Sequence, residues 1–517
     1  MRRMTYFVMA LALVLGLSQC KKEQVNTPEN ETKTVNITLN VGGNGGGSRH
    51  DINTTTGAVD FKNGDVIYVG NGSTYIGTLT RNSDVFSGNI IEPADGTEIF
   101  FYFVGGLTTD PADLSGQSSF TVNISDQTTK LPVLSLNQAT YHTNVTDYSC
   151  ELKNQCGLVK FRTNVASGTV SVGGMNTVAT ITFGSNTITA GTSGAVSFAT
   201  DGDGNGWAIL LMQDGVDEAT VTADGYFDGK CDVPEITRNM WYNEGVEVSL
   251  EPKTINLSEV SGDKTIQDGY TVTGTLGANV KISIADGATV TLDGVNITNL
   301  GNNCNWAGIN CPGDATIILK DGSTNTVCAG RDGWGYNNYP GIWIAPGKKL
   351  TIKGGGKLTA YSNNTKPYGA GIGGGFQIPC GNIEIQGGDI NATGGQWAAG
   401  IGSGSRGDSS TGANCGTITI SGGTVTATGG DGGAGIGSGR NSGANCGAIT
   451  ITTGVTQVTA TKGENAPNSI GYGLAGTCGT VTIGGTEYWN GSAYQNGGAT
   501  YLTTSPLVYP TPEQTKS

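Results

Sequence analysis

The chain has 517 residues, of which 86 are glycine and only 14 % are charged. Each glycine in a helix interior costs about 1 kcal/mol relative to alanine, which excludes a bundle of helices, and the absence of glycine at every third position excludes collagen. The formal charge is −14; residues 21–250 carry −14 and residues 251–517 carry −2. There is no basic stripe, so nucleic acid is not an expected partner.

Residues 1–19 have the pattern of a secretory leader, with a basic start and an apolar run over residues 7–17. The leader ends in Leu-Ser-Gln before Cys20 and resembles a bacterial lipobox, which implies cleavage before Cys20 and lipidation of its thiol. We therefore expect a lipoprotein anchored in the outer membrane and displayed at the cell surface, with residues 20–34 as a tether. The alternative is an ordinary leader that has a cysteine there by chance.

The acidic half predicts strands in two groups, separated by a break near residues 128–140. Alternating apolar residues and turn residues at the spacing of a sandwich indicate two antiparallel β-sandwich lobes, 35–130 and 131–250. The expected strands are residues 35–41, 65–69, 99–103, 158–161, 169–172, 179–183, 207–211 and 219–223.

Several motifs of this half occur in an order that resembles the fimbrillin-like surface lipoproteins of Gram-negative anaerobes. They are FKNGDVIYV at residues 61–69, VFSGNI at 85–90, FYF at 101–103 and LKNQCGLVKF at 152–161. The resemblance implies an exposed, non-enzymatic module with fimbrial subunits as candidate partners. A plain sandwich spacer is the alternative.

The glycine-rich half is built of repeats. CGNIEIQGGDINATGG at residues 380–395 matches CGTITISGGTVTATGG at 415–430, and an AGIG block recurs between the copies. Equivalent apolar positions are assigned at Leu319, Ile352, Ile385, Ile420, Ile451 and Ile483. A period of this size indicates stacked units of one kind.

Each repeat predicts three short strands separated by glycine corners, because apolar residues alternate with threonine at period two. We therefore expect a right-handed parallel β-helix of about seven coils over residues 251–500, followed by a C-terminal tail at 501–517. The alternative is a sandwich of hairpins. The predicted fold class of the whole chain is all-β.

The predicted register places Lys320 and Lys353 next to each other on adjacent coils, about 4.8 Å apart. Close like charges favour an acidic ligand. Solvated surface lysines are the alternative interpretation.

Aromatic residues gather around one long loop, which contains Trp334, Tyr336, Tyr339 and Trp343. Exposed rings of this kind suit stacking on sugars, although the rings are also typical of loop caps and helix corners. Asp332, Asn337 and Asn338 offer oxygens to a Ca²⁺ ion, but no dense carboxylate cluster accompanies them. No cofactor is expected.

Residues 290–297, the GAGIG blocks and the repeated GGxVTATGG segments resemble the parallel β-helix carbohydrate-binding domains of bacteria. The resemblance covers about 240 residues, and known members of the family include a binder of acidic pectic polymers. It implies the fold more than the ligand, because these residues build the coil.

We expect the other cysteines to have a structural role. Cys380, Cys415, Cys446 and Cys478 recur in register, which favours a column of buried thiols over disulfides or zinc. The pairs Cys150–Cys156 and Cys304–Cys311 are open either to disulfides or to reduced thiols.

No paired carboxylates stand out in the glycine-rich half and it contains no histidine, so a polysaccharide lyase or hydrolase is the least favoured interpretation. The favoured function is a non-catalytic surface lipoprotein that binds carbohydrate, acidic polysaccharide being one candidate, or that mediates adhesion. Its candidate residues are Trp334, Tyr336, Tyr339, Trp343, Lys320 and Lys353. A fimbria-associated or structural stalk protein without a small ligand is the alternative.

Overall fold

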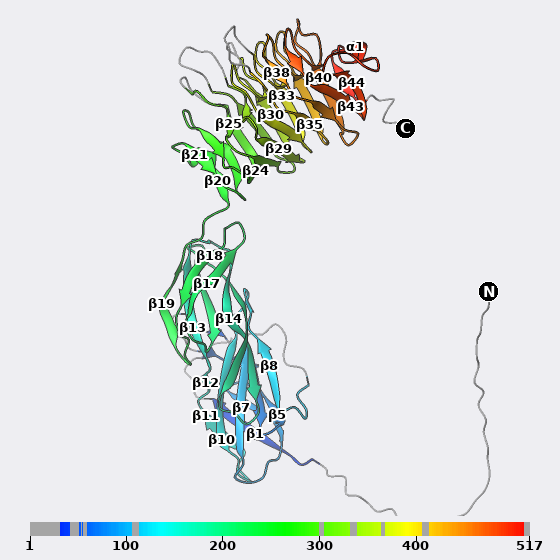
Figure 1. The fold of residues 1–517 in the computed structure, drawn as a ribbon. Coiled ribbons are helices and arrows are strands. Elements are labelled where there is room, and N and C mark those ends of the chain that lie inside the picture. Colours follow the sequence, from blue (N-terminus) through cyan, green and yellow to red (C-terminus); the bar gives the residue numbers. More distant parts are fainter. Residues whose placement is uncertain are drawn as a thin grey trace, which may run out of the picture. The chain divides into compact units, whose positions relative to one another are not determined.

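The computed structural model describes residues 32–41, 51–52, 54, 59–105, 113–298, 304–330, 339–362, 368–405 and 413–510. Its regular secondary structure is almost entirely β-strand, and it consists of two units. Unit 1 holds the described residues up to Asp224 together with Asp228–Leu250, and unit 2 holds Gly225–Phe227 and the described residues from Glu251 onward (Figure 1). The predicted all-β fold class is confirmed.

Unit 1 contains three larger sheets, in which most pairings are antiparallel. In sheet order, the eight-stranded sheet is β11 (Asp147–Cys150), β1 (Thr34–Val41), β6 (Val85–Ile91), β5 (Tyr75–Asn82), β4 (Val66–Gly70), β7 (Glu98–Gly105), β10 (Val133–Thr140) and β12 (Lys153–Asn154). The six-stranded sheet is β18 (Gly229–Val233), β17 (Val216–Ala223), β14 (Thr169–Thr182), β15 (Ile188–Ala199) and β9 (Asp126–Gln127), with β8 (Ser119–Asn123) on β14. The three-stranded sheet is β16 (Asn205–Leu211), β13 (Cys156–Thr163) and β19 (Trp241–Val248). The small strands β2 (Asp51–Ile52) and β3 (Val59–Asp60) form a further pair.

Strands pair across the expected boundary at residues 130 and 131 in both directions. Strand β8 lies before the boundary but pairs with β14, and β10 lies after it but pairs with β7. One hydrophobic cluster also includes residues from both sides, such as Phe101 and Phe183. We therefore describe unit 1 as one body. The expected strands at 169–172 and 179–183 are one long strand, β14.

Unit 2 is a three-sided parallel β-helix, and from β26 onward the successive coils each contribute one strand to a face. The first face contains β26 (Ala315–Leu319), β29 (Lys349–Gly354), β32 (Asn382–Ile385), β35 (Ile418–Ile420), β39 (Ile449–Ile451) and β43 (Thr480–Ile483). The second contains β27 (Thr324–Cys328), β30 (Lys357–Tyr361), β33 (Asp389–Thr393), β36 (Thr424–Thr428) and β40 (Gln457–Thr461). The third is an eight-stranded sheet of β21 (Lys264–Ile266), β23 (Ile282–Ile284), β25 (Ile309–Cys311), β28 (Ile342–Ile344), β31 (Ile372–Gly373), β34 (Ile401–Gly402), β37 (Ile436–Gly437) and β41 (Ile470–Gly471).

The first coils are less regular. Strand β20 (Thr254–Asn256) pairs with β22 (Thr271–Thr275), which pairs with the long strand β24 (Ala288–Ile297). Strand β24 pairs with both β26 and β27, so this one strand contributes to the first and the second face. A short 3-10 helix, Leu257–Glu259, lies between β20 and β21, and strand β38 (Asn445–Cys446) pairs with β42 (Thr477–Cys478) at one corner.

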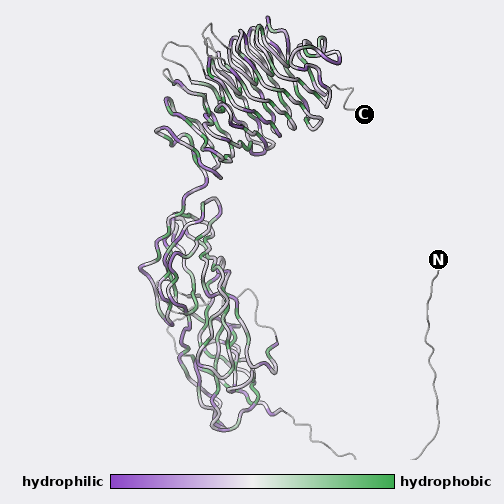
Figure 2. Tube along the Cα trace, viewed as in Figure 1, coloured by the Kyte–Doolittle hydropathy of each residue, from purple (hydrophilic) through white to green (hydrophobic). Residues whose placement is uncertain are grey.

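Repeated inward side chains stack into columns and form the core of unit 2. On the third face the column contains Ile342, Ile372, Ile401, Ile436 and Ile470, all fully buried. Burying each isoleucine contributes about 1.5–3 kcal/mol, while the outward threonines keep the strands soluble. Figure 2 shows apolar positions recurring from coil to coil.

One part of the predicted register is wrong. Ile317, rather than Leu319, pairs with Ile352, so Lys353 lies opposite Ile318 and two positions away from Lys320. The cause is that β26 buries Ala315, Ile317 and Leu319, whereas in β29 the residue opposite Leu319 is the exposed Gly354. The expected direct adjacency of Lys320 and Lys353 therefore does not occur.

The C-terminal end of the β-helix is capped. Strand β44 (Thr486–Asn490) pairs antiparallel with β43, and β45 (Leu507–Tyr509) pairs antiparallel with β40. On the third face, the backbone N–H of Ser469 donates to the carbonyl oxygen of Leu502 at 2.8 Å, just after the short helix α1 (Gly498–Tyr501). These contacts cover edges that would otherwise pair with other chains. Residues 501–510, expected as an extended tail, belong to this cap.

All ten described cysteines are thiols, so neither Cys150–Cys156 nor Cys304–Cys311 forms a disulfide. Cys415 lies beside Cys446, and Cys446 pairs in register with Cys478, as a buried column at one corner. Contacts between neighbouring thiols and burial raise the pKa of Cys446 well above its ordinary value. The column therefore fills a corner with protonated, unreactive thiols.

Candidate functional site

The predicted aromatic loop is only partly within the described structure. Trp334 and Tyr336 lie outside the described residues, as does the lipidation candidate Cys20. Tyr339 is half-buried, and its backbone carbonyl lies against Gly369 of the next coil. Trp343 lies on strand β28 rather than in the loop, where its indole N–H donates to the Pro379 carbonyl oxygen at 3.0 Å.

Lys320, Lys348, Lys349, Lys353 and Lys357 form a group that we call the lysine patch, and four of these five are paired with carboxylates. Lys320 Nζ lies 2.5 Å from Asp293 Oδ2, and three further lysines form similar pairs on neighbouring coils. These pairs are Lys348–Asp286, Lys349–Glu384 and Lys357–Asp389. Lys353 is exposed and points outward from β29. The pairs neutralise the patch, which weakens the expected preference for an acidic polymer.

The structure brings together a different aromatic set, which we call the aromatic corner: Tyr368, Phe376, Trp397 and Arg440. All four side chains are half-buried and lie at coil turns beside strands β31, β34 and β37. The ring of Tyr368 lies 5.2 Å from that of Trp397 and 5.4 Å from that of Phe376. The guanidinium carbon of Arg440 lies 5.2 Å from the centre of the Trp397 ring.

Arg440 is held in place from two sides. Its Nη1 lies 3.2 Å from Asp431 Oδ2, and the other oxygen of Asp431 accepts a hydrogen bond from Asn465 at 2.6 Å. The backbone N–H of Arg440 also donates to the Trp397 carbonyl oxygen at 2.7 Å. The cation is thus pre-positioned on the indole, an arrangement that contributes about 0.5–2 kcal/mol.

Trp397 carries two local energetic costs. Its backbone has φ +69°, a left-handed conformation that bulky residues rarely adopt. Its indole Nε1 is buried and has no hydrogen-bond partner within the described structure. Each feature costs about 1–3 kcal/mol, and such costs concentrate at functional positions.

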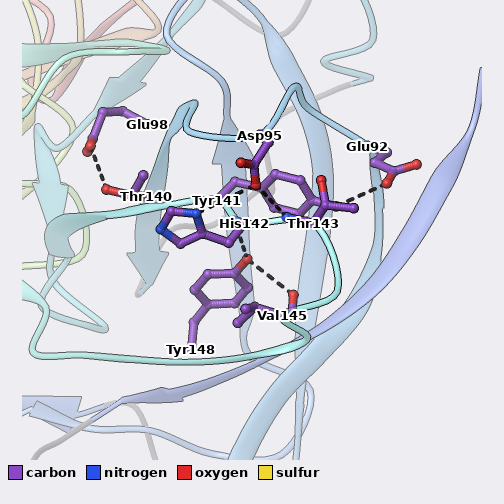
Figure 3. A network of polar contacts seen from close by, with 9 residues as sticks. All are labelled: Glu92, Asp95, Glu98, Thr140, Tyr141, His142, Thr143, Val145 and Tyr148. Carbon is purple, nitrogen blue, oxygen red and sulfur yellow. Dashed lines mark hydrogen bonds and ion pairs between the residues drawn. The ribbon is translucent and has the colours of Figure 1, made fainter.

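A second polar network lies in unit 1, around the loop after β10 (Figure 3). The Tyr148 hydroxyl donates to the Val145 carbonyl oxygen at 3.2 Å, and His142 Nδ1 lies 3.6 Å from Asp95. A hydrogen bond from Lys33 at 2.7 Å lowers the pKa of Glu92. These polar groups bind one another, so we interpret the network as one that stabilises the conformation of the loop.

Two further properties of the described residues bear on function. Within the ranges that the structure describes, no group of three or more His, Cys, Asp or Glu side chains could hold a metal ion. The described chain also has no helix that is both long and apolar enough to cross a membrane.

Comparison with known families supports the architecture of unit 2. Residues 350–376, 383–405 and 418–440 match the family model described as a beta helix repeat. The three segments correspond to the coils β29–β31, β32–β34 and β35–β37. They cover less than half of the chain. No curated protein matches it.

Solved structures resemble part of the chain at low identity. A "putative cell adhesion protein" from Bacteroides uniformis is 17 % identical, with a TM-score of 0.30, over 42 % of this chain and 97 % of that protein. One with the same description from Bacteroides ovatus is 12 % identical, with a TM-score of 0.29, over 43 % and 98 %. A fimbrial assembly protein from Parabacteroides distasonis is 10 % identical, with a TM-score of 0.26, over 42 % and 91 %. At this level, the likeness says nothing about function.

Proposed function

We propose that the chain is a non-catalytic cell-surface protein that adheres by binding carbohydrate at the aromatic corner of its β-helix. The observation that carries the proposal is the state of Trp397, a half-buried indole in a strained backbone conformation with a guanidinium stacked on it. Anchoring through a lipid on Cys20 belongs to the same proposal and rests on the leader sequence.

The corner has the groups that sugar recognition needs. Aromatic rings offer apolar faces for the C–H faces of a pyranose, and Arg440 supplies several N–H donors beside them. Tyr368 and Trp397 come from successive coils, so their rings lie along the direction in which the coils stack. A polysaccharide chain could therefore contact both rings at once.

The charges around the β-helix indicate a neutral or weakly acidic glycan. Lys320, Lys348, Lys349 and Lys357 form ion pairs, and Arg440 of the aromatic corner is itself paired with Asp431. A strongly anionic polymer would need a denser set of unpaired cations.

The test is a glycan array probed with the chain from Lys21 onward, comparing the native protein with Trp397→Ala and Trp343→Ala. We expect selective binding to one class of glycan that is lost in Trp397→Ala and retained in Trp343→Ala. Loss in Trp343→Ala alone would move the site to the surface around Trp343 on strand β28. A blank array for the native protein would overturn the proposal and favour the stalk interpretation.

A further inference from the structure

Unit 1 contains a cleft of about 700 Å³ between strands β18 and β19, which we call the edge cleft. Nine residues line it, among them Asp232, Trp241, Glu244 and Glu247. Strand β18 ends the six-stranded sheet and β19 ends the three-stranded sheet. The cleft therefore lies between two sheet edges that no other described strand covers. Its volume is typical of small-molecule sites, which measure about 300–1,000 Å³.

A bulge in β19 shapes one wall of the cleft. Val159 of β13 lies opposite Tyr242, but Phe161 lies opposite Val246, so three residues of β19 face Lys160 alone. These residues, Asn243 to Gly245, line the cleft, and Gly245 adopts φ +88°. Bulges redirect side chains and are frequent beside binding sites.

An exposed indole forms the apolar part of the cleft. Trp241 is 39 % exposed, one of four large apolar side chains classed as exposed in the described structure. Its ring stacks on Trp207 at 6.4 Å with an angle of 26° between the planes. The ammonium of Lys160 lies 5.8 Å from the Trp207 ring. Trp207 thus supports Trp241, which presents a flat apolar face to the cleft.

The charged groups of the lining all carry the same sign. Asp232, Glu244 and Glu247 line the cleft, and the lining contains no lysine, arginine or histidine. Glu247 pairs with Arg162 at 3.2 Å, while Glu244 has no ion pair within the described ranges. A carboxylate beside an indole face attracts a cation and repels an anion.

We infer that the edge cleft binds an oligosaccharide of protonated amino sugars. The C–H face of one sugar ring stacks on Trp241, and its ammonium group pairs with Glu244 and Asp232. A basic protein segment is disfavoured, because nine lining residues are few against the roughly 20–30 that each partner contributes to a protein interface. This site lies in another unit from the aromatic corner and takes a ligand of different charge, so it does not rest on the proposed function.

The inference is tested by calorimetric titration of the chain from Lys21 onward with a glucosamine trimer. The N-acetylglucosamine trimer serves as the uncharged comparison and trilysine as the comparison without sugar rings. We expect the glucosamine trimer to bind at least about tenfold more tightly than either, since 1.4 kcal/mol of charge pairing or stacking is a factor of ten. Trp241→Ala and Glu244→Gln should each weaken binding about tenfold or more.

Two control variants separate this site from other effects. Met240→Ala alters an exposed neighbour that does not line the cleft, and Trp397→Ala removes the proposed site in unit 2; both should bind the trimer as the native chain does. Trp241→Phe keeps a ring and should retain part of the affinity if Trp241→Ala fails to fold. Equal affinity for the acetylated trimer or for trilysine, or unchanged affinity in Trp241→Ala, would overturn the inference.

Discussion

The stacking of coils in unit 2 makes a sharp prediction for Gly402→Ala. Gly402 has φ +135°, and a Cβ atom on it would lie 1.9 Å from the carbonyl oxygen of Gly437 in the next coil. That oxygen also accepts a hydrogen bond from the backbone N–H of Ser403 at 3.0 Å. The methyl group therefore forces two coils apart and breaks a ladder bond.

Gly471 provides a matched control within the same column. Its φ is +130°, but it lies in the last strand of the third face, and a Cβ atom on it would have Asn468 as its nearest neighbour at 3.5 Å. Gly471→Ala therefore carries the same backbone strain, about 1–3 kcal/mol, without the clash. Gly402→Ala adds overpacking of about 1–3 kcal/mol and a lost hydrogen bond of about 1 kcal/mol.

The expected difference between the two variants is about 2–4 kcal/mol, which corresponds to roughly 5–15 °C in the melting temperature of a domain of this size. Thermal unfolding followed by circular dichroism measures it, with limited proteolysis to assign the transition to unit 2. Equal destabilisation by the two substitutions would refute the stacking of Gly402 against Gly437.

Buried or paired groups support three other predictions. Burial raises the pKa of Tyr102 to about 12, and its hydroxyl accepts hydrogen bonds from two backbone N–H groups. Tyr102→Phe should lower the free energy of unfolding by about 1–3 kcal/mol, as measured by urea unfolding. The stability contributed by the protonated hydroxyl should fall as pH rises from 10 to 12. The thiols of Cys415 and Cys446 should react with a maleimide only after unfolding, and rapid labelling of the folded chain would contradict the buried column. A hydrogen bond from the Asp314 backbone N–H, and a second one from Lys348, lower the pKa of Asp286 below its ordinary value of 3.8. The stabilising effect of the ionised Asp286 is therefore complete above pH 3.8 and is lost as pH falls further. Asp286→Asn should make the loss of stability in acid less steep, as measured by urea unfolding at a series of pH values.

The coils of unit 2 could be predicted because nearly identical residues recur at a fixed spacing, and in-register stacking turns recurrence into columns. The column of buried cysteines at one corner followed directly from this. The register failed at Leu319, where three alternate apolar residues precede a turn and the next coil has glycine in the third position. The alternation of apolar and polar residues does not show which of several apolar residues in one coil pairs with a given residue in the next coil.

The sites were harder to predict, because they depend on contacts between distant residues. Arg440 and Trp397 are 43 positions apart, and their contact needs the coil offset as well as the turn geometry. Neither residue was therefore singled out from the sequence. Trp241 was missed for a similar reason. A tryptophan within a strand is typically a core residue, and Trp241 is exposed because β19 lies at the edge of its sheet.

The carboxylates opposite the lysines were missed for a related reason. Asp293 and Lys320 are 27 residues apart and meet because they lie on successive coils. The prediction considered only the spacing of Lys320 and Lys353 and so missed the carboxylate that neutralises Lys320.

Binding of carbohydrate by the β-helix is proposed to depend on Trp397 and Tyr368. The most direct measurement is calorimetric titration of the best glycan from the array into the native chain, Trp397→Ala and Tyr368→Ala, with Trp343→Ala as the control. We predict saturable binding that weakens about tenfold or more in each corner variant and is unchanged in the control. Native affinity in Trp397→Ala, with the variant folded by circular dichroism, would contradict this role of the aromatic corner.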